Sequence, residues 1–162
     1  MRVERAVPED AHAVRALFDQ AAGWLTARHV RQWRPGSWPE PAISSAIARG
    51  EVWVVRGDSS LAATLSLLDA DPEIWGPSAG RELYLHKLVT ARERAGERLG
   101  ARLLDWAREQ ARARGRSWLR LDCVSGNPFL RRYYADAGFA ERGEVDLGRV
   151  RLARFEISAE PS

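Results

Sequence analysis

The chain has 162 residues, of which 45% are hydrophobic and 29% charged, a composition that suits one globular domain. We expect that domain to span residues 1–158, followed by a tail at 159–162. The single cysteine, Cys123, excludes an intramolecular disulfide, and no signal-like start or 18-residue apolar run is present, so we expect a cytoplasmic protein without a membrane partner. The net charge of +3 arises from 25 basic residues spread among 22 acidic ones. Spread charge without a binding motif predicts no nucleic-acid partner.

The first half of the chain alternates strand and helix patterns. Apolar residues recur at helical spacing after Pro8, and alternating residues on both sides of the turn 57–60 predict a β-hairpin. Prolines and a glycine mark 34–41 as a loop. The predicted elements, in chain order, are a strand at 2–7, a helix from Pro8 through Phe18, a second helix from about Trp24 to about Trp33, a helix at 43–49, hairpin strands at 51–56 and 61–69, and a loop at 71–80.

The segment 83–139 carries the most specific pattern. An apolar strand runs into a turn at 95–100, and an amphipathic helix follows until Gly115, where a residue able to take positive φ is favoured. Free N–H groups and the dipole at the start of that helix suit a phosphate, and Arg92, Arg94 and Arg98 add positive charge. The alternative is that Gly96 and Gly100 only allow close packing of the helix.

The remaining elements complete an α/β pattern. A strand at 118–123 leads to a short helix with Asn127 as N-cap and Pro128 at its first position, and the helix ends at Gly138. Two further strands, at 139–145 and ending near Ile157, form a hairpin whose apolar surface would suit a homodimer. The pattern predicts a mixed sheet flanked by helices.

Together these residues resemble the GCN5-related N-acetyltransferase (GNAT) superfamily. The resemblance lies in Asn127, Tyr134 seven residues later, and Gly138-Phe139 four residues after that, and in the turn at 95–100. Ala95 replaces the usual Gln or Arg of the family's pyrophosphate loop, and Arg98 stands where the middle glycine is usual. The resemblance implies a mostly antiparallel sheet of about seven strands in which two central parallel strands splay apart.

The resemblance also implies acetyl-CoA as cofactor and a set of residues that bind it. The strand 88–90 and Asn127 would contact the pantetheine arm, and the loop would hold the pyrophosphate. The implied cofactor-binding residues are Leu88, Val89, Thr90, Arg94, Ala95, Gly96, Glu97, Arg98, Leu99, Gly100, Ala101, Asn127 and Tyr134.

Direct attack of an amine on a thioester requires an acid, an oxyanion donor and, for some acceptors, a base. Tyr134 is the candidate acid, because a phenol can donate to the departing thiolate; the alternative is a core tyrosine. The backbone N–H of Leu88 is the candidate oxyanion donor. Strand alternation puts Glu82 and His86 on one face, so both are candidate bases, although a strand histidine is often structural. Asp122 could line the same site or bond to backbone.

The expected function is therefore an acetyl-CoA-dependent N-acetyltransferase acting on a primary amine of a small molecule or peptide. The alternative is a domain that binds acyl-CoA without turnover, as a sensor or a partner-binding module. Trp75 near Asp69, Asp71 and Glu73 could favour a cationic acceptor, or these acids could simply be solvated. His12 and His29 show no metal-ligand spacing, so we expect no metal.

Overall fold

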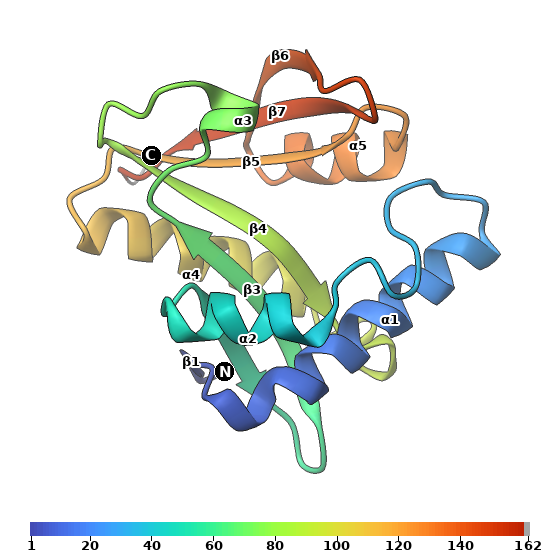
Figure 1. Ribbon diagram of the computed structural model, residues 1–162. Coiled ribbons are helices and arrows are strands. Elements are labelled where there is room, and N and C mark those ends of the chain that lie inside the picture. The colour runs from blue at the N-terminus through green and yellow to red at the C-terminus, as the bar shows by residue number, and fades with distance from the viewer. Residues whose placement is uncertain (161–162) are drawn as a thin grey trace. The chain divides into compact units, whose positions relative to one another are not determined.

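The computed structural model describes residues 1–160. Within this range the chain forms seven strands, five α-helices and two short 3₁₀ helices (Figure 1). In chain order these are β1 (Val3–Arg5), η1 (Pro8–Asp10), α1 (Ala11–Ala27), α2 (Glu40–Ala48), β2 (Val52–Arg56), β3 (Leu61–Leu68), α3 (Pro72–Trp75), β4 (Glu82–Thr90), η2 (Arg92–Arg94), α4 (Leu99–Ala113), β5 (Trp118–Val124), α5 (Pro128–Asp136), β6 (Ala140–Asp146) and β7 (Arg151–Ser158).

The strands follow the order β1-β2-β3-β4-β5-β7-β6 in one sheet. The pairs β1/β2, β2/β3, β5/β7 and β6/β7 are antiparallel, whereas β4 and β5 are parallel. A parallel pair needs a crossover connection, and α4 supplies it. The predicted fold class, a mixed sheet of about seven strands flanked by helices, is confirmed.

The chain divides into two compact units, which we describe separately. The first unit comprises Met1–Leu67 and Lys87–Gly100. Its core is built from the apolar faces of α1, α2 and the first strands, where Val14, Ile47 and Val54 are almost fully buried. Asp10 is also buried, and its carboxylate accepts hydrogen bonds from Arg56 and from the backbone N–H of Val7. These contacts satisfy a charge that would otherwise be costly to bury.

An aromatic cluster of Phe18, Trp33 and Trp38 lies at the edge of this core, with ring centroids 5.7–6.5 Å apart. The ammonium nitrogen of Lys87, the only lysine of the chain, lies 3.9 Å from the centroid of the Trp38 ring. Burial lowers the pKa of this lysine from its usual value. Lys87 also has a φ of 54°, so the backbone of β4 takes a left-handed conformation at one residue in the middle of the strand.

The second unit comprises Leu68–His86 and Ala101–Ser162, of which the structure describes the part up to residue 160. Its centre is the antiparallel pair β5/β7, in register over the whole of Trp118–Val124. Leu121, Phe155 and Tyr134 are buried in it. The predicted tail is partly ordered by this unit, since Ala159 is buried and its N–H donates to the carbonyl of Ser117. Residues 161–162 of that tail lie outside the described residues.

Two predictions for single elements are wrong. The expected helix break near Trp24 does not occur, because α1 continues to Ala27 and ends where His29 takes a φ of 56°. The apolar residues around Trp24 extend the first helix instead of starting a second, and Trp33 lies outside any helix. The expected loop at 71–80 contains the one-turn helix α3, in which Pro72 occupies the first position.

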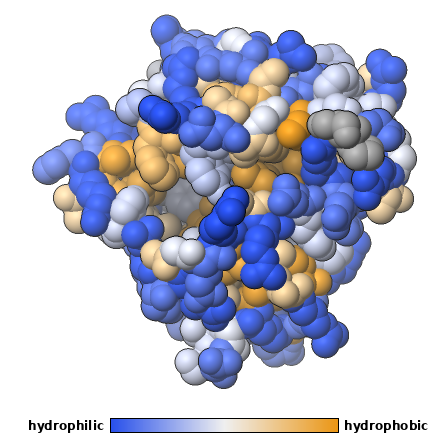
Figure 2. Space-filling model, turned by 180° about the vertical axis from the view of Figure 1, so that it is seen from behind, coloured by the Kyte–Doolittle hydropathy of each residue, from blue (hydrophilic) through white to orange (hydrophobic). Residues whose placement is uncertain are grey.

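Hydrophilic side chains cover much of the face seen in Figure 2, with smaller apolar patches between them. Among the described residues we find no helix whose length and apolar character would let it cross a membrane.

Candidate active site

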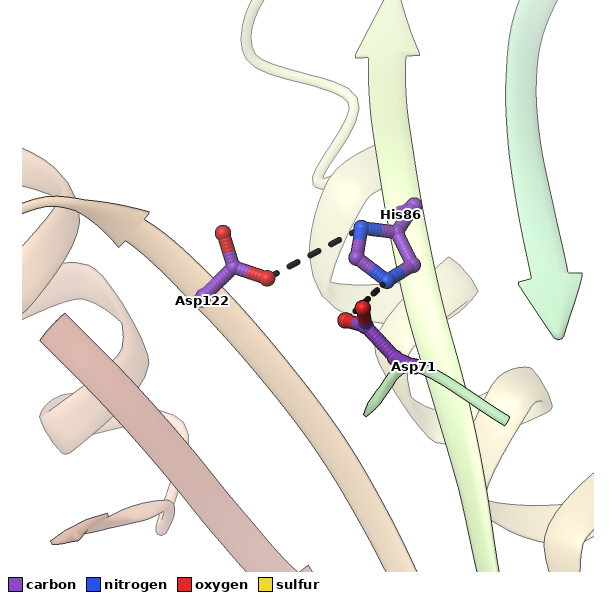
Figure 3. Close-up of side chains that lie close together, drawn as sticks. All are labelled: Asp71, His86 and Asp122. Carbon is purple, nitrogen blue, oxygen red and sulfur yellow. Dashed lines mark ion pairs between the residues drawn. The ribbon is translucent and has the colours of Figure 1, made fainter. Parts of the chain in front are cut away.

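The parallel strands β4 and β5 pair only at their beginning. Glu82, Leu83 and Tyr84 are in register with Trp118, Leu119 and Arg120, and the pairing of the two strands ends there. Two residues beyond the pair Tyr84/Arg120 come His86 and Asp122, which therefore lie on the same face and in the same row. Their side chains point toward each other, with Nδ1 of His86 3.7 Å from Oδ2 of Asp122 (Figure 3).

His86 is held between two carboxylates in the second unit. Its Nε2 lies 2.9 Å from Oδ2 of Asp71, and its Nδ1 lies 3.7 Å from Oδ2 of Asp122. Figure 3 shows Asp71 approaching one edge of the ring from the segment before α3, while Asp122 approaches the other edge from β5. The three side chains are only 11–20% exposed. Neither of the two oxygens has a partner with hydrogen-bond geometry in the described range 1–160, so Asp71 acts on Nε2 through its charge at 2.9 Å.

The side chain of Asp71 contacts His86 and does not cap the helix that follows it. It occupies the N-cap position of α3, where an aspartate usually accepts a hydrogen bond from a backbone N–H of the first turn. Its side chain makes no such bond and turns toward His86 instead. A lost cap of this kind costs about 1 kcal/mol, and such departures from local preference concentrate at functional sites.

Burial raises the pKa of Asp122 to about 6; the charge of His86 opposes this increase, and the charge of Asp71 adds to it. Because the carboxyl group binds its proton more tightly in the folded protein than in the unfolded chain, folding stability falls as the pH rises from about 4 to 6. The ionised Asp122 is therefore a destabilising residue at neutral pH.

This predicts that Asp122→Asn stabilises the protein at pH 7. The expected gain in the free energy of unfolding approaches roughly 3 kcal/mol, since each pKa unit corresponds to about 1.4 kcal/mol. The gain should disappear near pH 3, below both pKa values, where Asp122 is protonated in the folded and in the unfolded state. Urea unfolding at the two pH values measures it, with the exposed Asp136→Asn as control. An equal effect of Asp122→Asn at both pH values would contradict the prediction.

Glu82, the second candidate base, is committed to a neighbouring ionic network. It is buried, accepts hydrogen bonds from the hydroxyl of Ser78 and the N–H of Arg81, and lies 3.6 Å from Arg120. Arg120 also donates to Glu156 at 2.6 Å. Burial alone would raise the pKa of Glu82, but the bond from Ser78 and the charge of Arg120 outweigh it and lower the pKa. A carboxylate with a lowered pKa is a weaker base.

Tyr134, the candidate acid, is buried on α5 among aromatic rings. Its ring centroid lies 6.1 Å from that of Phe139 and 5.7 Å from that of Phe155. Burial raises its pKa well above the usual value, so the hydroxyl stays protonated at physiological pH. The neighbouring Tyr133 is the more exposed of the two tyrosines.

Two other residues of the second unit have clear local roles. Asn127 is buried and caps α5, because its Oδ1 accepts a hydrogen bond from the N–H of Leu130 at 3.2 Å; this confirms the predicted N-cap. Cys123 is fully buried, and burial raises the pKa of its thiol to about 12. A thiol with this pKa forms very little thiolate and is a poor nucleophile.

The predicted pyrophosphate loop lies in the first unit and is exposed from Ala95 to Arg98. Gly96 has a φ of 92°, and nothing within 4 Å would meet a Cβ there. Arg98 has a φ of 54°, the left-handed conformation that a glycine adopts without strain. Arg98 therefore takes the kind of conformation for which the family's usual glycine is suited. Arg94 is paired with Glu97, so its charge is partly neutralised.

The sequence did not single out the cluster of Asp71, His86 and Asp122 as a unit. Their ligand atoms all lie within 4.8 Å of one another, a set that could also hold a metal ion. Asp71 precedes His86 by a loop and a helix, and Asp122 follows it by a crossover, so sequence spacing carries no sign of the contact. The unused cap at Asp71 is a structural signal only.

Comparisons with known proteins agree with the fold and the motifs. Residues 12–139 match the model of the acetyltransferase (GNAT) family. The chain is 35% identical over 162 residues to YesJ, an uncharacterized N-acetyltransferase of Bacillus subtilis, covering 96% of this chain and 89% of YesJ. Solved structures that share the fold include one from Listeria monocytogenes and one from Salmonella typhimurium.

The first of these structures is a GNAT-family acetyltransferase from Listeria monocytogenes, with a TM-score of 0.81 and 23% identity over 97% of this chain and 94% of the other. The second is yncA from Salmonella typhimurium, solved with its cofactor acetyl-CoA, with a TM-score of 0.68 and 18% identity over 100% and 95% of the two chains. With a family match over most of its length and a relative at this level of identity, the chain belongs to the acetyltransferase (GNAT) family.

Proposed function

We propose that the protein is an acetyl-CoA-dependent N-acetyltransferase that moves an acetyl group to a primary amine of a small molecule or peptide. The observation that carries the proposal is the end of the β4/β5 pairing with His86 and Asp122 pointing toward each other just beyond it, in a chain of the acetyltransferase family. The solved relative yncA holds acetyl-CoA, which supports the same cosubstrate here. Acetyl-CoA supplies the activated acetyl group as a thioester.

The loop before α4 and the first turn of that helix fit the phosphate end of this cosubstrate. The first-turn N–H groups of α4 have no partners within the helix and carry partial positive charge. The positive φ angles at Gly96 and Arg98 turn the loop before α4 without bulky contacts at Gly96. We assign the pyrophosphate to Arg94–Ala101 and the pantetheine arm to the backbone of Leu88–Thr90. By the family resemblance we also propose Asn127 and Tyr134 as cosubstrate-binding residues.

We infer direct attack of the amine on the thioester in a ternary complex. His86 accepts the proton of the incoming ammonium group, because Asp71 beside Nε2 favours a proton on that nitrogen and leaves Nδ1 to act as acceptor. The N–H of Leu88 stabilises the oxyanion, and Tyr134 donates a proton to the departing thiolate. An acyl-enzyme on Cys123 is disfavoured by the raised pKa of that thiol. Glu82 stays in its network with Arg120.

The first test is calorimetric titration with acetyl-CoA, using two variants of the loop. Arg98→Gly should bind acetyl-CoA as well as the unaltered protein does, since glycine adopts φ 54° readily. Arg98→Val should weaken binding by about tenfold or more, because a β-branched residue is strained there and the loop must rearrange.

If acetyl-CoA does not bind the unaltered protein, the proposed function is wrong. If Arg98→Gly weakens binding as much as Arg98→Val does, the guanidinium itself contacts the cosubstrate and the conformational argument is wrong. Binding without release of thiol in the presence of any amine would favour the alternative of a non-catalytic acyl-CoA sensor.

A further inference from the structure

The carboxylate of Asp122 is buried, and its Oδ2 has no hydrogen-bond donor among residues 1–160. Its side chain is 12% exposed. The nearest cationic candidate is His86, but 3.7 Å from Oδ2 to Nδ1 is too long for a hydrogen bond. Buried carboxylates are normally paired or hydrogen-bonded, so this oxygen lacks a partner that a ligand could supply.

The arginine closest in register does not provide that partner. Arg154 lies directly across the β5/β7 register from Asp122. Its guanidinium instead donates to the carbonyl of Ile74 at 3.4 Å and lies 5.5 Å from the centroid of the Trp75 ring. Arg120, one row away, is paired with Glu156. The guanidinium groups of Arg154 and Arg120 therefore contact other groups and do not pair with Asp122.

The imidazole of His86 completes the same site. Asp71 at 2.9 Å favours the proton on Nε2, so that Nδ1 presents a lone pair toward Asp122. Two acceptors 3.7 Å apart can both be reached by one nitrogen at about 2.8 Å from each, which is the ordinary length of a charge-assisted hydrogen bond. A primary ammonium group has three N–H donors and can use two of them here.

We propose that the acceptor is a strongly basic aliphatic amine without a carboxylate on the carbon that carries the nitrogen, and that it binds as an ammonium ion bridging Oδ2 of Asp122 and Nδ1 of His86. This inference rests on the proposed function and specifies its substrate class. Asp122 is the anchor of the ammonium group, His86 takes its proton, and Asp71 is a positioning residue that acts through His86.

The chemical step balances without any further reactant. One N–H proton of the ammonium ion passes to Nδ1 of His86 and later to water. The neutral nitrogen forms a bond to the carbonyl carbon of the thioester, and the C–S bond breaks. The departing sulfur receives a proton from Tyr134, which is replenished by the second proton lost from the nitrogen. The products are an N-alkylacetamide and the free thiol of coenzyme A.

The two aspartates also define what the site rejects. An α-amino acid would bring its own carboxylate close to the oxygens of Asp122 and Asp71, and both are shielded from water. Repulsion between like charges at low dielectric disfavours that arrangement. We therefore expect amines to be preferred over the amino acids that differ from them only by the α-carboxylate.

The test compares matched acceptors and matched variants. 2-Phenylethylamine is compared with phenylalanine, and pentylamine with norleucine, by release of thiol from acetyl-CoA. We expect kcat/KM to favour the amine of each pair by at least about tenfold. Asp122→Asn should raise the KM for the amine by about tenfold or more and largely remove the preference, whereas the exposed Asp136→Asn should change neither. The affinity for acetyl-CoA should be the same in all three proteins.

Binding of pentylamine is also measured by calorimetry in the absence of acetyl-CoA, so that failure of the two proposals can be told apart. Loss of acetyl-CoA binding alone would overturn the proposed function and leave the ammonium site standing. The inference is overturned by equal use of amines and amino acids, by an unchanged KM in Asp122→Asn, or by no binding of pentylamine. Saturable uptake of Zn²⁺ that excludes pentylamine, and that is lost in His86→Asn, would show a metal site instead and would also overturn it.

Discussion

His86→Asn should lower turnover at pH 7 by about 10²–10⁴-fold, the usual contribution of a general base. The amide has no basic nitrogen, so the acceptor amine, which is almost entirely protonated at this pH, is no longer deprotonated in the complex. Asparagine is smaller than histidine and polar, which keeps a hydrogen-bonding group near the position of Nδ1. Steady-state release of thiol measures the loss, and titration with acetyl-CoA should give an unchanged Kd.

The pH dependence of that loss distinguishes a base from a structural residue. Toward pH 10 an aliphatic amine becomes neutral in solution and needs no base, so the rates of His86→Asn and of the unaltered protein should converge. A variant that only disturbed the strand would remain slow at all pH values. A constant ratio of the two rates between pH 7 and 10 would therefore exclude His86 as the base.

Tyr134→Phe should lower kcat by about 10–100-fold, while the affinity for acetyl-CoA stays nearly the same. The hydroxyl is the only group removed, and the ring contacts with Phe139 and Phe155 can persist in the variant. Burial keeps the phenol protonated over the whole physiological range of pH, so a proton is available for the departing thiolate, but the same raised pKa makes the phenol a weaker acid.

The neighbouring tyrosine provides the control for this experiment. Tyr133 lies on the same helix, is more exposed, and has its ring against those of Phe129 and Tyr134. Tyr133→Phe should leave kcat within about twofold of the unaltered protein. If Tyr134→Phe reduces turnover and cosubstrate affinity to the same extent, Tyr134 is a binding or packing residue and the acid lies elsewhere.

The sequence predicted the parts of this protein that local chemistry specifies. Asn127 followed by Pro128 defines the start of α5 because each residue type fits its capping position. The alternation of β4 placed Glu82 and His86 on one face, and the structure shows both on it. Which of the two is free to act as a base depends on Arg120 and Ser78, and strand alternation gives no information about those contacts.

The rest of the candidate site depends on tertiary contacts. Asp71 appeared in the sequence as one acid of a polar loop, and only the folded chain turns its carboxylate from the helix cap to His86. The end of α1 was missed for a related reason: the apolar residues near Trp24 suit either a continued or a new helix, and packing in the first unit selects the continued one.

The boundary between the two compact units falls within β4, and this limits which fragments of the protein can be exchanged by recombination. One segment of the second unit ends at His86. The next segment, Lys87–Gly100, belongs to the first unit, and the second unit resumes at Ala101. The unit that holds Asp71, His86 and Asp122 is therefore discontinuous in sequence, and it cannot be excised or exchanged as one contiguous fragment. A contiguous fragment that carries Asp71, His86 and Asp122 into another chain also carries residues 87–100, so the proposed acceptor site and the proposed cosubstrate loop are inherited together.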